Sequence, residues 1–245
     1  MKKWMFLCIL LLLAGCKQQT PASDISEPAQ AEQSAPETSE QAPQTEQQSV
    51  QAVPETPPAP PPPDDPAEFV RVQDYIPDIM VDLRYATENN FTGSVIYNYT
   101  DAWLRYGTVC KLAQAQQALR PQGYGLCIWD AFRSAQAQDA LWAAYPDGNY
   151  VANPANGYSG HTRGDTVDIT LIALDGQPVE MPSGFDDFSA AADRDYSDVS
   201  ELAANHAHLL EQAMENSGFK GYAKEWWHYS DTEKHPPETA FAPPS

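Results

Sequence analysis

Two of the five histidines stand near acidic residues at spacings that could build a metal centre. His161 comes seven residues before Asp168, and His228 comes three residues after Glu225. Two imidazoles and one carboxylate can hold zinc with a fourth position open to water, as in catalytic zinc sites. A second carboxylate close by could then accept a proton from that water. The pattern predicts metal-assisted hydrolysis, although a structural His–Asp pair would show the same spacing.

Bringing these four side chains together requires particular local structure. His161 and Asp168 lie on either side of a predicted turn at Gly164, after which the chain enters a predicted strand. Glu225 and His228 would point to opposite faces of a regular strand. We therefore expect a bulge or a strand end between Glu225 and His228.

The other three histidines are weaker candidates. His206 and His208 are two residues apart on a predicted helix and so face different ways, which favours solvated or packing roles. His235 lies in a polar, Pro-rich segment, and we assign it no role.

The elements that must position the site alternate irregularly between strand and helix. Residue patterns predict strands at 81–85, 124–130, 166–174 and 219–229. Amphipathic patterns and their terminators predict helices at 101–119, 135–145 and 199–217. This order predicts one α+β domain over residues 67–245, with a small, mostly antiparallel sheet flanked by helices.

The N-terminal residues predict export. Lys2 and Lys3 precede an apolar run that is too short to span a bilayer and that ends in Leu-Ala-Gly-Cys16. This end resembles the bacterial lipobox, so we expect residues 1–15 to be a signal peptide and Cys16 to be lipidated, with an ordinary signal peptide as the alternative. Lys17 favours the outer over the inner membrane. The expected location is the cell envelope, lipid-anchored and facing the periplasm.

Residues 16–66 are predicted to form a tether. Residues 17–66 contain 12 of the 22 prolines and lack aromatic residues, a composition typical of disordered spacers. A docking motif for a Pro-binding partner is the alternative. The domain that follows carries 11 Lys and Arg against 25 Asp and Glu, a net charge of −14. This charge argues against nucleic acid as a partner and leaves the lipid anchor as the expected membrane contact.

Cys110 and Cys127 are the two cysteines of the predicted domain. In an oxidising compartment they could form a disulfide, and two reduced thiols are the alternative.

Two motifs carry a family resemblance. The pattern Ser159-x-His161-x-x-Gly164-x-x-x-Asp168 is followed by Glu225-x-Trp227-His228. Together they resemble the zinc signature of the M15 peptidases, and in particular the VanX-type D-alanyl-D-alanine dipeptidases. Supporting segments lie at 82–87, 90–93, 128–133 and 214–219.

The resemblance implies a role for each matching residue. His161, Asp168 and His228 would bind one Zn²⁺ per chain, and Glu225 would be the general base. Arg133 would stabilise the oxyanion, a task that suits its rigid fork of donors; a surface ion pair is the alternative.

The resemblance also implies substrate contacts at Ser159 and Asp186, the latter near the free amine of the substrate. Two departures from the family pattern stand close to the site. Thr166 occupies a position where a small residue is usual, and Ser134 follows Arg133 where the family usually has proline.

The expected reaction is hydrolysis of D-alanyl-D-alanine, a small dipeptide substrate. Export would separate the enzyme from the cytosolic pool of cell-wall precursors, which favours turnover of peptidoglycan-derived dipeptide over antibiotic resistance. A D,D-carboxypeptidase acting on stem peptides, or a catalytically inactive wall-binding lipoprotein, are the alternatives.

Overall fold

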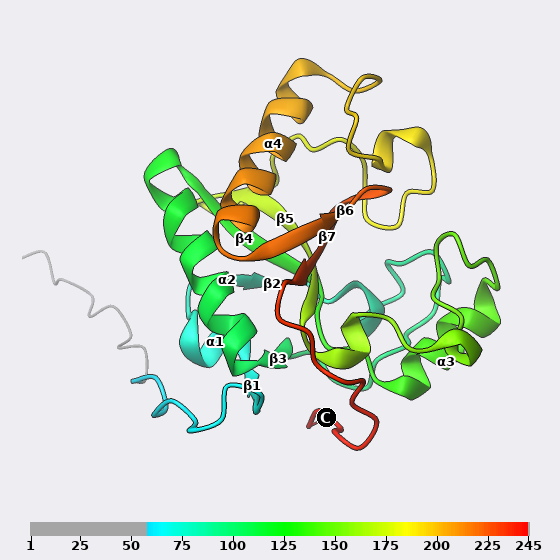
Figure 1. The fold of residues 1–245 in the computed structure, drawn as a ribbon. Coiled ribbons are helices and arrows are strands. Elements are labelled where there is room, and N and C mark those ends of the chain that lie inside the picture. The colour runs from blue at the N-terminus through cyan, green and yellow to red at the C-terminus, as the bar shows by residue number, and fades with distance from the viewer. Residues whose placement is uncertain (1–57, 245) are drawn as a thin grey trace, which may run out of the picture. The chain divides into compact units, whose positions relative to one another are not determined.

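A five-stranded sheet organises residues 58–244, the part of the chain that the computed structural model describes (Figure 1). Its strands lie in the order β2 (Met80–Val81), β4 (Tyr124–Asp130), β5 (Thr166–Ala173), β7 (Glu225–Asp231) and β6 (Phe219–Tyr222). β2 and β4 run parallel, whereas the β4–β5, β5–β7 and β6–β7 pairs are antiparallel. The prediction of an α+β fold with a mostly antiparallel sheet is confirmed.

The described residues also form four α-helices and a two-stranded sheet. The helices are α1 (Val72–Tyr75), α2 (Tyr106–Leu119), α3 (Ala135–Ala144) and α4 (Glu201–Asn216). The small sheet pairs β1 (Phe69–Arg71) with β3 (Trp103–Arg105). Short 3₁₀ turns span Arg84–Ala86, Arg120–Gln122, Pro154–Asn156, His161–Arg163 and Ala190–Ala192. Between residues 58 and 244, every helix is too short or too polar to cross a bilayer.

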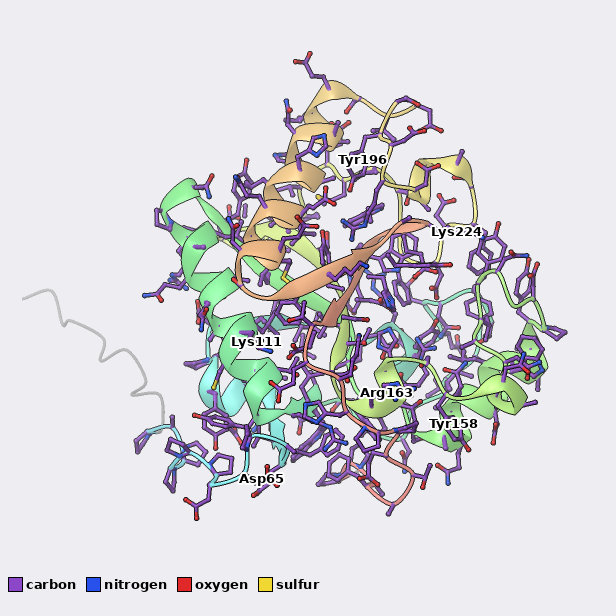
Figure 2. All side chains as sticks on the ribbon, in the orientation of Figure 1. Asp65, Lys111, Tyr158, Arg163, Tyr196 and Lys224 are labelled. Atoms are coloured by element: carbon purple, nitrogen blue, oxygen red, sulfur yellow. The ribbon has the colours of Figure 1, made fainter. Side chains whose placement is uncertain are left out.

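Three predicted boundaries are wrong. The helix predicted from residue 101 begins at Tyr106, because Leu104 pairs with Val70 in the small sheet and is fully buried there. The strand predicted at 81–85 ends at Val81, and the chain then turns into a 3₁₀ helix. The range 219–229 is a hairpin of two strands, with Lys224 near its tip (Figure 2).

The two faces of the large sheet carry different side chains. Tyr124, Leu126 and Ile128 of β4 point to the face covered by α2 and α4, where the Tyr124 hydroxyl lies 3.0 Å from Nε2 of His206 on α4. Alternation places Cys127 and Thr170 on the other face, which loops cover. The candidate active site lies on that loop-covered face.

The N-terminal end of the described chain contacts the domain. The carbonyl of Pro61 accepts a hydrogen bond from the Tyr75 hydroxyl at 3.2 Å, and the carbonyl of Pro66 accepts one from the amide of Gly107 at 2.9 Å. Contacts with the domain therefore begin before the predicted boundary at residue 67. The predicted signal peptide, Cys16 and the tether up to residue 57 lie outside the described residues.

Cys110 and Cys127 are free cysteines in the structure, so the disulfide prediction is wrong. Cys127 faces the loop-covered side of the sheet near Asp82, whereas Cys110 lies on α2 beside Tyr106. Burial raises the pKa of the Cys127 thiol to about 12, which keeps it protonated and unreactive.

Candidate active site

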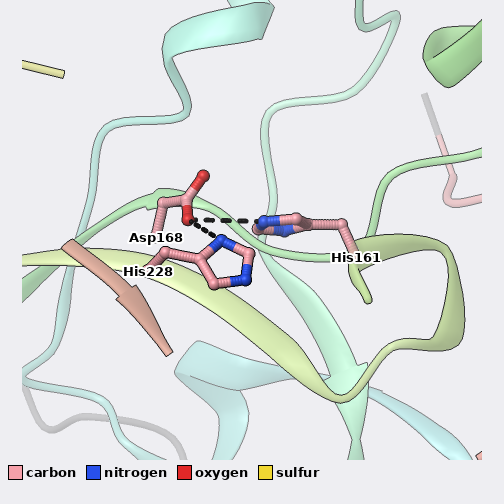
Figure 3. Close-up of side chains that lie close together, drawn as sticks. All are labelled: His161, Asp168 and His228. Atoms are coloured by element: carbon pink, nitrogen blue, oxygen red, sulfur yellow. Dashed lines mark hydrogen bonds and ion pairs between the residues drawn. The ribbon is translucent and has the colours of Figure 1, made fainter. Parts of the chain in front are cut away.

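Three predicted metal ligands meet where β5 pairs with β7 (Figure 3). His161 Nε2 lies 3.3 Å from Asp168 Oδ1, and His228 Nδ1 lies 3.0 Å from the same oxygen. The candidate ligand atoms of all three residues are within 4.8 Å of one another. The long-range placement follows from the strand register, in which Asp168 and His228 are direct cross-strand partners.

A tight turn at Gly164 brings His161 close to Asp168. Gly164 ends the 3₁₀ turn with φ of 74°, and its amide donates to the carbonyl of His161 at 3.1 Å. A Cβ atom on Gly164 would lie 2.4 Å from Cε1 of Phe69. Both the positive φ and the close ring therefore require glycine at this position.

An interruption of the β6–β7 ladder brings Glu225 beside His228, as the sequence led us to expect. Gly221 pairs with Tyr229 but the next residue, Tyr222, pairs with Glu225, so residues 226–228 bulge out of the ladder. Glu225 Oε2 consequently lies 3.5 Å from His228 Nδ1. Burial raises the pKa of Glu225 to about 7, a value suited to a group that accepts and returns a proton near neutral pH.

The hydrogen bond of His161 to the main chain orients its ring toward the cluster. Its Nδ1 lies 2.8 Å from the carbonyl oxygen of Ala131, which can only accept. Nδ1 must therefore donate to that carbonyl, so Nε2 is the ring nitrogen that faces Asp168; it pairs with the carboxylate when protonated and would bind a metal ion once deprotonated. Burial alone would raise the pKa of Asp168, but the His161 and His228 rings hold it well below its usual range. Two imidazole nitrogens and an ionised carboxylate form a donor set that fits zinc.

Arg133 is held beside this cluster by an aspartate to which the sequence analysis assigned no role. Asp130 is fully buried, and its Oδ2 accepts from Nε of Arg133 at 3.1 Å and from Nη2 at 2.5 Å. Its Oδ1 accepts from the Tyr97 hydroxyl at 2.6 Å and from the amide of Ala131 at 2.8 Å. Although burial opposes the charge, Asp130 keeps the pKa of Arg133 above its ordinary value. The acidic residue three positions before Arg133 was the available sequence signal.

A cavity of about 240 Å³ opens onto these groups. It is smaller than the roughly 300–1,000 Å³ of pockets for drug-sized ligands. Aromatic side chains form part of its wall, together with Ser159, Asp186, Arg133, Glu225 and the three candidate ligands. The aromatic wall residues are Tyr85, Phe91, Tyr150, Phe188 and Tyr222.

Ser159 and Asp186 both carry polar groups available to a ligand. The Ser159 hydroxyl is buried and has no hydrogen-bond partner among the described residues. Asp186 accepts a 2.7 Å hydrogen bond from the Tyr85 hydroxyl on one carboxylate oxygen. Burial raises the pKa of Asp186 to about 7, which that hydrogen bond partly opposes. A cationic group beside Asp186 would relieve this cost by pairing with the carboxylate.

The two departures from the family pattern leave the cavity unobstructed. The Thr166 hydroxyl lies 2.9 Å from the Ser230 hydroxyl and occupies space that a Cβ on Gly160 would fill, at 2.2 Å. Ser134 is the N-cap of α3, where its hydroxyl accepts from the amide of Ala137 at 3.2 Å. Thr166 therefore packs beneath the loop, and Ser134 stabilises a helix start.

The remaining histidines have structural surroundings, as predicted for His206 and His208; no role was predicted for His235. His206 Nδ1 lies 2.7 Å from the carbonyl of Glu180, and its Nε2 contacts Tyr124. His208 is exposed and packs edge-on against Tyr196. The amide of His235 donates to Asp165 at 3.0 Å.

Comparison with known proteins identifies the family. Residues 65–243 match the M15 peptidase family described as D-ala-D-ala dipeptidase. The D-alanyl-D-alanine dipeptidase of Escherichia coli is 34% identical over 165 residues, 67% of this chain and 85% of that relative. Those of Enterococcus faecalis and Streptomyces coelicolor are each 34% identical over 194 residues, 71% of this chain and 96% of each relative. The chain therefore belongs to the D-Ala-D-Ala dipeptidase family of the M15 metallopeptidases.

Proposed function

We propose that this chain is a zinc-dependent dipeptidase that hydrolyses D-alanyl-D-alanine in the cell envelope and serves turnover of peptidoglycan-derived dipeptide. The observation that carries the proposal is the convergence of His161, Asp168, His228 and Glu225 on one small cavity. The names of the curated relatives support the choice of substrate.

His161, Asp168 and His228 would hold the ion. Zinc bound there would lower the pKa of water and polarise a carbonyl group. Glu225, next to His228, accepts the proton of the attacking water and returns it to the leaving amine. Burial raises the pKa of Glu225 to about 7 in the metal-free protein, which favours its holding and returning a proton.

Arg133 and Asp186 supply opposite charges within the same cavity. Arg133 donates to the scissile carbonyl oxygen as negative charge develops there, and Asp130 keeps the guanidinium in place. Asp186 pairs with the free ammonium group of the dipeptide, and the Ser159 hydroxyl gives one further hydrogen bond to the substrate. A longer peptide would place a neutral amide, not an ammonium, beside Asp186, which selects for dipeptides.

The test is D-alanine release by the full-length chain, purified in detergent and loaded with zinc. D-Ala-D-Ala and a pentapeptide stem ending in D-Ala-D-Ala are assayed in parallel. We expect release from the dipeptide alone, and a loss of about 10²- to 10⁴-fold in kcat for Glu225→Gln. Glu215→Gln, the same chemical change at an exposed position of α4, is the matched control with unchanged kcat.

Release from the pentapeptide would instead indicate a D,D-carboxypeptidase. Binding of either peptide without release would indicate a wall-binding protein. Activity retained after removal and exclusion of divalent metals would contradict zinc dependence.

The envelope location rests on the sequence around Cys16 and has its own test. We expect labelled palmitate to be incorporated into the wild-type chain and to be lost in Cys16→Ser, which would also leave the membrane fraction. Labelling that persists in Cys16→Ser would contradict lipidation at this cysteine.

A further inference from the structure

The bulge that places Glu225 beside His228 disturbs the main chain at the site. Residues 226–228 lie between the last two paired positions of the β6–β7 ladder. In a regular hairpin, every second carbonyl along this stretch would accept a hydrogen bond from β6, and the others would face β5. Buried main-chain carbonyls require other donors when a ladder opens.

Arg194 supplies those donors from outside the hairpin. Its Nη2 donates to the carbonyl of Trp226 at 2.9 Å and to the carbonyl of His228 at 3.2 Å. Its Nε donates to the carbonyl of Tyr222 on β6, also at 2.9 Å. One planar guanidinium thus bridges the two strands where their ladder is interrupted.

The remaining contacts hold Arg194 itself in place. Nη1 donates to Glu211 on α4 at 3.0 Å and to the Tyr229 hydroxyl at 3.2 Å, so all five N–H donors have partners. The main-chain amide of Arg194 donates to the carbonyl of Ala223 in the hairpin turn at 3.2 Å. Although burial opposes the charge, Tyr229 and Tyr196 help to keep the pKa of Arg194 above its ordinary value.

Gly221 provides the room for this arrangement. A Cβ on Gly221 would lie 2.4 Å from Cζ of Arg194, and 2.6 Å and 2.7 Å from its Nη atoms. Any larger residue at position 221 would force the guanidinium away from the carbonyls.

We propose that Arg194 is a positioning residue, which fixes His228 and Glu225 relative to each other by replacing the hydrogen bonds missing from the β6–β7 ladder. Arg194 is absent from the described wall of the cavity and acts through the main chain of β7. The inference rests on the proposed function, because it assigns His228 to the metal and Glu225 to proton transfer. A lysine ammonium is a compact charge and could not reach the same three carbonyls with a rigid fork.

The test compares Arg194→Ala, Arg194→Lys and Gly221→Ala with the wild-type full-length chain. Gly221→Ala retains every polar group and displaces only the guanidinium. For each variant we expect zinc affinity to fall by about 10- to 100-fold, and kcat with it, the usual effect of losing a residue that orients a metal ligand. The visible absorption spectrum of the cobalt-substituted protein should also change, because it reports the geometry of the ligands directly.

Rescue distinguishes positioning from a general loss of stability. Millimolar guanidinium chloride should restore the cobalt spectrum and part of the activity of Arg194→Ala, whereas sodium chloride at equal ionic strength should not. Arg120→Ala, which removes an arginine that pairs with Asp78, is the matched control with wild-type zinc affinity.

Wild-type zinc affinity and cobalt spectra in folded Arg194→Ala or Gly221→Ala would overturn the proposal. Failure of the wild-type chain to release D-alanine from D-Ala-D-Ala would instead contradict the proposed function. Zinc affinity and the cobalt spectrum would still test Arg194 in that case.

Discussion

The two faces of the five-stranded sheet are built from the same strands and stabilised in different ways. Toward α2 and α4, β4 and β5 present Ile128 and Ile169, which are fully buried among apolar side chains. On the loop-covered face, the ends of the same two strands carry Asp130 and Asp168, which are almost as deeply buried. Packing stabilises the first face, whereas the second requires a partner for each charge.

The buried and half-buried carboxylates of the loop-covered face fall into two groups. Asp130 and Asp168 are matched by Arg133 and by two histidines, so their charge is compensated. Burial raises the pKa of Glu225 and of Asp186 to about 7, because their surroundings compensate less. The compensated carboxylates hold other groups in place, and the less compensated pair is available to protons and to a cationic substrate.

The sharpest test of this contrast removes a compensated carboxylate. Asp168→Ala leaves His161 and His228 without the oxygen that both contact, so we expect loss of bound zinc and D-alanine release at the uncatalysed background. Metal analysis and the release assay measure both. Asp175→Ala, in the exposed turn after β5, is the control. Stoichiometric zinc with substantial activity in Asp168→Ala would refute the assignment.

Arg133→Lys tests whether the pairing of Asp130 with Arg133 also positions the guanidinium for catalysis. A lysine keeps the charge but cannot contact both Asp130 and a substrate oxygen with a planar fork. We expect kcat to fall by about 10²- to 10³-fold, the usual effect of losing an oxyanion donor. Zinc content should remain that of the wild type. An unchanged kcat would place the oxyanion donor elsewhere.

Asp186→Asn probes a carboxylate whose charge is poorly compensated. Losing the charge that we propose pairs with the substrate ammonium group should raise KM by about 10- to 100-fold, equivalent to the roughly 1.5–3 kcal/mol of a charged hydrogen bond. The Asn side chain can still accept the hydrogen bond from Tyr85. A wild-type KM would show that the amine binds elsewhere.

Asp186→Asn should also change how the stability of the metal-free protein depends on pH. Because burial raises the pKa of Asp186 to about 7 in the folded state, above about 3.9 when unfolded, its contribution to stability is greatest at low pH. That contribution is lost as the pH rises through 7. Asp186→Asn should therefore raise the melting temperature at pH 8 by about 2–4 °C, which corresponds to about 1 kcal/mol for a domain of this size. The gain should be smaller at pH 4, and equal effects at both pH values would contradict the raised pKa.

The smallest effect on catalysis is expected from the helix-covered side. Leu112 is fully buried on α2, and Leu112→Ala should lower the free energy of unfolding by about 2–5 kcal/mol. Activity per folded, zinc-loaded molecule should stay at the wild-type value. Chemical denaturation and active-site titration measure the two quantities, and a large fall in kcat would show that the two faces are coupled.

Several elements of the fold were predictable because their signals are local. The alternation of β5, the amphipathic pattern of α4 and the glycine that closes the turn before Asp168 are all contained in short stretches of sequence. The start of α2 was not, because residues 103–105 have a helix-compatible pattern yet pair with β1 across a long sequence separation. The predicted disulfide between Cys110 and Cys127 was wrong because the distance between the two residues depends on which side of the sheet each occupies.

The sequence by itself determined the acidic character of the chain and a local motif typical of zinc hydrolysis, with its family resemblance. Tertiary structure decided which atoms meet: the register that pairs Asp168 with His228, the bulge that brings Glu225 to them, and the contacts of Asp130 and Arg194. Those features join residues far apart in the chain, so they depend on strand register and packing. Local residue preferences carry no information about such contacts, because the free energy that selects them arises only when the strands and helices assemble.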